Sequence, residues 1–229
     1  MDAILFDFNG VLVDDEHLHL AGFNAVLADF GVTLSPALYE ARYIGFDDRG
    51  AFEAALRDHG HAAPDDVVRR LIADKARWYL ARASAELKIF PGAAALVAAC
   101  ADRGPVGVVS GALRAEIELA LGLMGVHDRV RCIVAAEDVT ACKPDPAGYL
   151  AALDALTAQG ISLRPDRVVA LEDTPAGVRA ARAAGLRVAA VAQSVPEAAL
   201  REAGAQLTRP TVAALSPEIL AALTAQPVA

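Results

Sequence analysis

The sequence contains few cysteines and no cysteine motif. Of its 229 residues only Cys100, Cys132 and Cys142 are cysteines, and no two of them form a Cys-x-x-Cys pair. An odd count without disulfide or zinc spacing is typical of a reducing compartment. We therefore expect a cytoplasmic protein whose cysteines pack as small hydrophobic side chains.

Aromatic residues and basic runs are also scarce. Aromatics make up 5% of the chain, and the formal net charge is −8. Nucleic-acid-binding proteins use stacked aromatics and basic surfaces, so we expect no nucleic acid partner. No apolar stretch is long enough to span a bilayer, and Asp2 stands where a signal peptide would carry positive charge. We therefore expect no membrane partner.

The residues that are present indicate an α/β fold with an insertion. The chain is 55% hydrophobic, enough for a sizeable core. A short apolar run at residues 3–6 predicts a buried strand, and helical patterns then continue to about residue 90. From there strands and helices alternate, which is typical of a doubly wound parallel sheet of the Rossmann-like type. We expect a discontinuous core of residues 1–14 and 91–229, and a small all-helical domain of residues 15–90 inserted after the first strand.

The element boundaries follow from the same patterns and from turn residues. Strands are predicted at residues 3–6, 106–109, 132–135, 168–171 and 188–191, with a weaker one near 206–208. Helices are predicted at residues 18–31, 36–42, 50–59, 65–83, 93–103, 112–121, 146–159 and 175–184, and from residue 217 onward.

Polar residues follow several predicted strands directly. Asp7, Ser110 and the pair Glu172-Asp173 each stand at the carboxyl end of a strand. Each alone also fits a strand terminator or a helix cap. In open parallel sheets, however, the carboxyl ends of the strands are where ligands bind. Several such residues together therefore predict a ligand site at this edge.

The residue types at this edge suit a phosphate and a metal ion. Ser110-Gly111 precedes a predicted helix, where a hydroxyl and free amides can hold a phosphate. Lys143, followed by Pro144, can neutralise a carboxylate and a phosphate oxygen together, although a solvated loop lysine is the competing interpretation. The adjacent acids Glu172 and Asp173 repel each other without a cation, and Mg²⁺ prefers such oxygen ligands. Attack of Asp7 on phosphorus would use all of these groups.

Four motifs in order resemble the haloacid dehalogenase-like superfamily. They are Asp7-Phe8-Asn9-Gly10-Val11, Val108-Val109-Ser110-Gly111, Cys142-Lys143-Pro144 and Leu171-Glu172-Asp173-Thr174. The resemblance points to the branch with sugar-phosphate phosphatases and β-phosphoglucomutase, and it implies a helical cap. By this resemblance Asp7 is the nucleophile, and Mg²⁺ is held by Asp7, the Asn9 main-chain carbonyl, Glu172 and Asp173. Ser110 and Lys143 would then bind the transferring phosphate.

Asn9 departs from the family pattern. The family's phosphatases and mutases carry an aspartate two residues after the nucleophile as general acid and base. An amide does not shuttle protons at neutral pH, and loss of such a group slows turnover by about 10²–10⁴-fold. We therefore expect the chain as written to be impaired in catalysis. Asn9 is compatible with an engineered trap, with a naturally slow enzyme or binding protein, and with deamidation of Asn9-Gly10 to aspartate.

Further substrate-binding candidates come from the resemblance alone. His19 and Lys75 resemble cap residues of the mutase branch, and the loop from Gly45 to Arg49 stands where that branch has a specificity loop. The mutase spacing, a glycine followed three residues later by arginine, is broken because Asp48 stands there and Arg49 is shifted by one. Helix-surface side chains are the competing interpretation for the cap residues and for Arg114. The full set of expected substrate-binding residues is Gly10, Gly111, Ala112, Arg114, His19, Arg49 and Lys75.

The first-ranked function is a Mg²⁺-dependent phosphatase acting on a small phosphorylated metabolite, a sugar phosphate or phosphoglycolate-like compound. A β-phosphoglucomutase-like phosphomutase and an inactive phosphate-ester binding protein stay open as alternatives. A dinucleotide-binding protein would carry Gly-x-Gly-x-x-Gly after its first strand, and Asn9-Gly10-Val11 does not provide it. We expect a monomer or weak homodimer.

Overall fold

The computed structural model describes residues 1–43 and 46–225, and the chain forms two compact units. The core unit comprises Met1–Asp14 and Lys88–Ala229, and the helical unit comprises Asp15–Leu87. Whether the predicted ranges fold as independent domains stays a prediction. Among the described residues, none of the helices combines the length and the apolar character needed to cross a bilayer.

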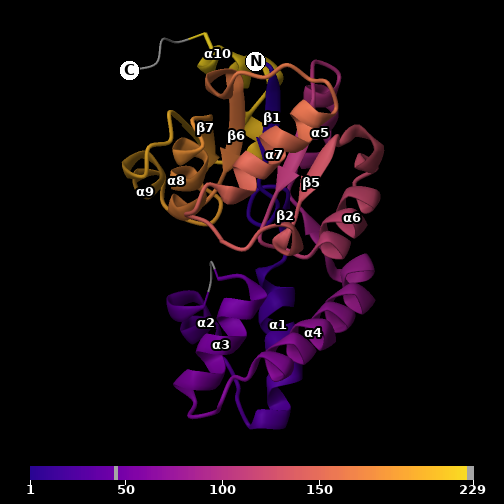
Figure 1. The fold of residues 1–229 in the computed structure, drawn as a ribbon, viewed down its shortest axis with the longest axis vertical. Helices are drawn as coiled ribbons and strands as arrows, with labels where there is room; N and C mark the ends of the chain where they lie inside the picture. Colours follow the sequence, from indigo (N-terminus) through magenta and orange to yellow (C-terminus); the bar gives the residue numbers. More distant parts are fainter. Residues whose placement is uncertain (44–45, 226–229) are drawn as a thin grey trace. The chain divides into compact units, whose positions relative to one another are not determined.

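In the described part of the chain, the core unit is built on a six-stranded, fully parallel sheet (Figure 1). The predicted doubly wound α/β fold is thereby confirmed. In sheet order the strands are β5 (Cys132–Val134), β4 (Val106–Val109), β1 (Ala3–Phe6), β6 (Val168–Glu172), β7 (Arg187–Val191) and β8 (Leu207–Arg209).

The central strands are buried along their whole length because helices cover both sheet faces. β1, β4, β6 and β7 are buried at every position, as continuous apolar runs in parallel sheets are. On one face α7 (Ala147–Ala158) packs on β4 and β5, and α8 (Pro175–Ala183) packs on β6 and β7. The other helices of this unit are α5 (Ala93–Ala101), α6 (Arg114–Leu123), α9 (Glu197–Glu202) and α10 (Pro217–Leu223).

β1 lies at the point where the strand order reverses. The chain runs from β4 to β5 on one side of β1 and returns to β6, β7 and β8 on its other side. In register, Phe6 of β1 lies between Val108 of β4 and Leu171 of β6. The residues that follow these three strands therefore meet at one edge, where doubly wound sheets bind ligands.

The helical unit consists of α1 (Glu16–Leu27), α2 (Pro36–Arg42), α3 (Asp48–Asp58) and α4 (Asp65–Glu86) in its described residues. Phe23 belongs to the apolar cluster of this unit, and its ring centroid lies 4.8 Å from that of Phe52 and 5.8 Å from that of Tyr39. Side-chain caps define two helix starts, because Ser35 accepts the Leu38 amide and Asp47 accepts the Gly50 amide.

Several predicted boundaries were wrong for local reasons. α6 begins at Arg114, two residues late, because the Ala112 amide donates to the Ser110 hydroxyl and the Leu113 amide to the Glu116 carboxylate. α3 begins at Asp48, because Asp47 is its cap. Two features were not predicted, the short helix α9 and the antiparallel pair of β2 (Val13–Asp14) and β3 (Lys88–Ile89). Strands of two residues are too short to leave an alternating pattern.

Candidate active site

Lys143 contacts residues at the carboxyl ends of three strands, β1, β4 and β6. Its Nζ donates to Oδ1 of Asp7 at 2.7 Å and to the Val109 carbonyl at 3.1 Å. The same nitrogen lies 2.7 Å from Oε1 of Glu172. Asp7 follows β1 directly, and its amide donates to the Leu171 carbonyl in β6. The Lys143–Pro144 peptide bond is cis. The lysine predicted to neutralise a carboxylate at this edge therefore contacts two of them.

Glu172 is held by hydrogen bonds at both of its carboxylate oxygens. Oε1 accepts the Tyr149 hydroxyl at 2.5 Å, in addition to its contact with Lys143. Oε2 accepts the Asp173 amide at 3.3 Å. Gly177 in α8 leaves the space for this carboxylate, since a Cβ there would lie 2.0–2.2 Å from its atoms. Glu172 thus fixes Lys143 in place.

Asp173 has one oxygen held and one free for a ligand. Ser194, in the loop after β7, donates its hydroxyl to Oδ2. Oδ1 is buried and has no hydrogen-bond partner among the described residues. Oxygens of Asp7, Glu172 and Asp173 lie within 4.8 Å of one another. This all-oxygen donor set, with one orphaned buried oxygen, could hold a hard divalent cation such as Mg²⁺.

Burial and the neighbouring charges shift the pKa values of Glu172, Asp173 and Lys143. Burial, and then the Asp7 carboxylate, raise the pKa of Glu172 to about 7, although Lys143 opposes the shift. Burial also raises the pKa of Asp173 well above its ordinary value, with Asp7 and Glu172 adding to it. Burial alone would lower the pKa of Lys143, but Asp7 and Glu172 outweigh it and raise the pKa. Negative charge is thus in excess at this edge.

Ser110 contacts Asn9, which follows Asp7 by two residues in the sequence. The Ser110 hydroxyl donates to Oδ1 of Asn9 at 3.2 Å and accepts the Ala112 amide at 3.1 Å. Gly111 is exposed, between the two partners of this turn. The hydroxyl predicted to hold a phosphate therefore lies in the same unit as Asp7 and Lys143, but in a turn and not at the first residue of α6.

Arg114 is committed to partners within the core unit. Its guanidinium donates to the Ile133 carbonyl at 3.1 Å and to the Asp138 carboxylate at 2.5 Å. This geometry matches the competing interpretation, a helix-surface charge, and substrate binding by Arg114 stays a prediction.

The loop after β7 contributes two residues that sequence reasoning missed. Gln193 donates to the Gly10 carbonyl at 2.7 Å and accepts the Val212 amide at 2.9 Å, so it ties down the turn after β1. Ser194 holds Asp173. A Cβ on Gly10, whose φ is +75°, would lie 1.9 Å from Oδ2 of Asp173. A polar pair one residue beyond the predicted strand at 188–191 was the available signal, because it stands at the same sheet edge.

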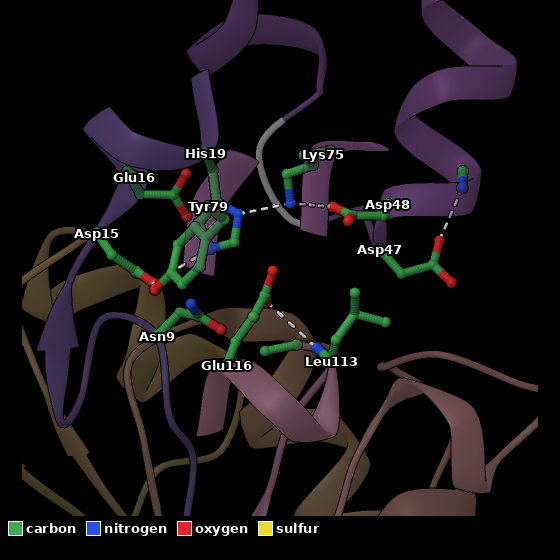
Figure 2. A network of polar contacts seen from close by, with 12 residues as sticks. Asn9, Asp15, Glu16, His19, Asp47, Asp48, Lys75, Tyr79, Leu113 and Glu116 are labelled. Atoms are coloured by element: carbon green, nitrogen blue, oxygen red, sulfur yellow. Dashed lines mark hydrogen bonds and ion pairs between the residues drawn. The ribbon is translucent and has the colours of Figure 1, made fainter. Parts of the chain in front are cut away.

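The helical unit has its own buried polar cluster, drawn in Figure 2. Lys75, with a side chain 0% exposed, lies 2.8 Å from Nδ1 of His19 and 2.5 Å from Oδ1 of Asp48. Nε2 of His19 lies 3.1 Å from Oδ2 of Asp15, which also accepts the Tyr79 hydroxyl at 2.5 Å. His19 and Lys75, which resemblance had singled out, are therefore direct neighbours, and Asp15, Asp48 and Tyr79 were missed.

The predicted specificity loop is described only in part. Gly45 lies outside the described residues. Arg49 is in α3, where it pairs with Asp65 at 2.8 Å and is half exposed. Asp48, which stands where the mutase branch has its arginine, instead pairs with Lys75. The roles of Arg49, His19 and Lys75 in substrate binding stay predictions.

Characterised proteins similar to this chain include phosphatases. A validoxylamine A 7'-phosphate phosphatase from Streptomyces hygroscopicus subsp. limoneus is 30% identical over 200 residues, which cover 87% of this chain and 89% of that protein. Among solved structures, CbbY from Rhodobacter sphaeroides in complex with phosphate superposes with a TM-score of 0.82 at 27% identity, over 94% of this chain and 96% of that one. A CbbY variant in complex with xylulose-(1,5)bisphosphate gives a TM-score of 0.80 at 28% identity, with the same coverage of both chains.

The family model for haloacid dehalogenase-like hydrolases matches residues 4–191. This range runs from the second residue of β1 to the end of β7 and includes all four motifs on which the resemblance rested. The resemblance is thereby confirmed, and the chain belongs to the haloacid dehalogenase-like hydrolases.

Proposed function

We propose that this protein is a Mg²⁺-dependent phosphatase that hydrolyses a small phosphorylated metabolite through an aspartyl-phosphate on Asp7. The single observation that carries the proposal is the placement of Lys143. Its ammonium lies 2.7 Å from the Asp7 carboxylate, in the same cluster as the orphaned oxygen of Asp173. Nucleophile, cation and metal ligand are the parts that phosphoryl transfer needs.

In this mechanism the chain mainly positions groups and balances charge. The free oxygen of Asp7 attacks phosphorus, and the Lys143 ammonium neutralises negative charge on the phosphoryl oxygens. The Ser110 hydroxyl and the Gly111 amide bind another of these oxygens. Asp7, Glu172 and Asp173, with the Asn9 carbonyl, would hold Mg²⁺, and Glu172 also fixes Lys143. Bound Mg²⁺ would offset the charge that builds up as the phosphoryl group transfers.

The relatives support the choice of a phosphatase. One similar protein is named for dephosphorylating validoxylamine A 7'-phosphate, and CbbY structures hold phosphate and a sugar bisphosphate. We therefore assign a phosphorylated sugar or sugar-like compound as the substrate class. His19, Arg49 and Lys75 of the helical unit are the residues we expect to select among such compounds.

The test is phosphate release from a panel of phosphorylated sugars and small phosphorylated acids, with Mg²⁺ and with EDTA. We expect Mg²⁺-dependent release by the wild type and none by Asp7→Asn, which keeps the shape but removes the nucleophile. A hydroxylamine-labile phosphoprotein should form only when Asp7 is present. Isomerisation without phosphate release would instead identify a phosphomutase, and tight ester binding without turnover would identify a binding protein.

A further inference from the structure

Tyr149 touches both members of the ion pair that Lys143 forms with Glu172, and all three residues belong to the core unit. Its hydroxyl donates to Oε1 of Glu172 at 2.5 Å, and the Lys143 ammonium nitrogen lies 5.4 Å from its ring centroid. We infer that Tyr149 is a positioning residue of the active site, whose hydroxyl orients Glu172 and thereby places the Lys143 ammonium. The inference rests on the proposed function, in which Lys143 acts together with Asp7.

Three acceptors determine where the Lys143 ammonium lies. Nζ donates to Oδ1 of Asp7 at 2.7 Å and to the Val109 carbonyl at 3.1 Å, and it lies 2.7 Å from Oε1 of Glu172. An ammonium group has three protons, so these contacts use its full donor capacity. Val109 belongs to β4, whose backbone is fixed by the sheet, whereas the Glu172 oxygen stands at the end of a long side chain. The position of the ammonium therefore depends on what holds Glu172.

The Tyr149 hydroxyl makes the shorter of the two hydrogen bonds that hold the Glu172 carboxylate. Its distance of 2.5 Å is typical of a hydroxyl donating to an ionised carboxylate, a strong kind of hydrogen bond. Oε2 of Glu172 accepts the Asp173 amide at 3.3 Å, which is longer than a typical N–H···O bond. Among the described residues, Tyr149 is therefore the main contact that orients Glu172, apart from Lys143 itself.

Tyr149 can serve as a fixed point because its side chain is fully buried. It packs in the apolar core cluster that also contains Val109 and Val134. It lies in the first turn of α7, and α7 packs on β4 and β5. A tyrosine side chain turns about only two χ angles, so burial of the ring also fixes its hydroxyl. The distance from Lys143 to the ring centroid is within the range of a cation–π contact.

Tyr43 shows what a hydroxyl with a structural role looks like in this chain. It lies in the helical unit, and its hydroxyl donates to Oδ2 of Asp58 at 3.0 Å. The same oxygen accepts Nε of Arg42 at 2.9 Å. As at Glu172, one carboxylate oxygen accepts from a phenol and pairs with a cation. Tyr43→Phe is therefore a matched control that removes the same kind of hydrogen bond.

Tyr149→Phe removes the hydroxyl and keeps the volume of the ring. The ester is the one that the wild type hydrolyses fastest in the phosphatase panel, at saturating Mg²⁺. We expect kcat to fall about 10–100-fold, because misplacement of a charge-neutralising group weakens transition-state stabilisation. KM should change much less, since a loss confined to the transition state lowers kcat and kcat/KM together. Tyr43→Phe should leave both constants unchanged. A wild-type kcat in Tyr149→Phe, or equal losses in the two variants, would overturn the inference.

A measurement on Lys143 itself separates positioning from stability. The lysines of the chain are Lys75, Lys88 and Lys143, so lysine labelled at Nζ and Cε gives few NMR signals, and Lys143→Arg identifies that of Lys143. We expect Tyr149→Phe to shift the Lys143 signal and to leave those of Lys75 and Lys88 in place. An unchanged Lys143 signal together with unfolding at lower urea concentration would mean that the hydroxyl only stabilises the core, and it would overturn the inference.

Failure of the proposed function gives a different result. In that case the wild type hydrolyses no ester of the panel, while the Lys143 signal still moves in Tyr149→Phe. The phosphatase assignment would then be overturned, and the dependence of Lys143 on Tyr149 would stand.

Discussion

Ser194 donates a hydrogen bond to Oδ2 of Asp173, and the other oxygen of Asp173 is buried without a hydrogen-bond partner among the described residues. A residue outside the four motifs therefore determines which Asp173 oxygen is available to a metal ion. Such supporting hydrogen bonds orient metal ligands and typically change metal affinity by about 10–100-fold.

Replacing Ser194 by alanine should therefore weaken Mg²⁺ binding by about 10–100-fold, because Asp173 loses the contact that orients it. Calorimetric titration with Mg²⁺, and Mn²⁺ titration followed by EPR, measure this without relying on turnover. Ser194→Thr keeps the hydroxyl and should retain most of the affinity. An alanine variant with wild-type affinity would show that Ser194 does not position the metal ligand.

Substitution by alanine should have different effects at two helical glycines, a loss of activity at Gly177 and a gain of stability at Gly122. In α8, a Cβ on Gly177 would meet the Glu172 carboxylate at 2.0–2.2 Å, so Gly177→Ala should displace Glu172 and Lys143 and reduce phosphatase activity. In α6, Gly122 has nothing within 4 Å, so Gly122→Ala should leave activity intact and stabilise the protein by about 0.5–1 kcal/mol. Steady-state kinetics and urea unfolding give the two readouts. Full activity in Gly177→Ala would show that the Glu172 carboxylate can move without loss of function, which would contradict this prediction.

Asp48→Ala should destabilise the protein because it leaves the buried Lys75 ammonium without its 2.5 Å partner. Removing one member of a buried ion pair costs about 3–5 kcal/mol. The exposed pair of Asp74 and Arg77 is the matched control, and Asp74→Ala should cost less than about 1 kcal/mol. Urea unfolding measures both. Adding Lys75→Met to Asp48→Ala should recover much of the loss, and equal effects of the two alanine variants would contradict burial as the cause.

The three thiols should differ in reactivity at mildly alkaline pH. Burial raises the pKa of Cys100 to about 12 and that of Cys132 to about 11. A raised pKa means less thiolate at a given pH, and thiolate is the reactive form. With a thiol reagent at pH 8, the exposed Cys142 should therefore react first in the folded protein. Peptide mapping of the labelled protein identifies the modified residue, and rapid labelling of Cys100 would contradict this expectation.

The site residues that directly follow a strand could be predicted from the sequence. Asp7, Ser110 and the pair Glu172-Asp173 follow apolar runs directly, and parallel strands bring such residues to one edge whatever the helices between them do. Lys143 was predicted through the sequence around it, Cys142-Lys143-Pro144. These residues occupy one compact unit, as the strand order requires.

The supporting residues could not be predicted in the same way. Tyr149 lies in the first turn of α7, and only helix rotation decides that its hydroxyl meets Glu172. The link between Lys75 and Asp48 joins two helices, and the sequence does not specify their packing angle. Pairings of this kind depend on tertiary packing, whereas propensity and periodicity are local.

The short ribbon of β2 and β3 has a consequence for how such proteins diversify. Val13 pairs with Ile89 and Asp14 with Lys88, so the chain leaves and re-enters the core unit at neighbouring, hydrogen-bonded positions. An insert attached in this way does not change the distance between the two points at which it joins the core unit. Helices can therefore be lengthened, exchanged or replaced there by recombination, while Asp7 and Lys143 keep their positions in the core unit.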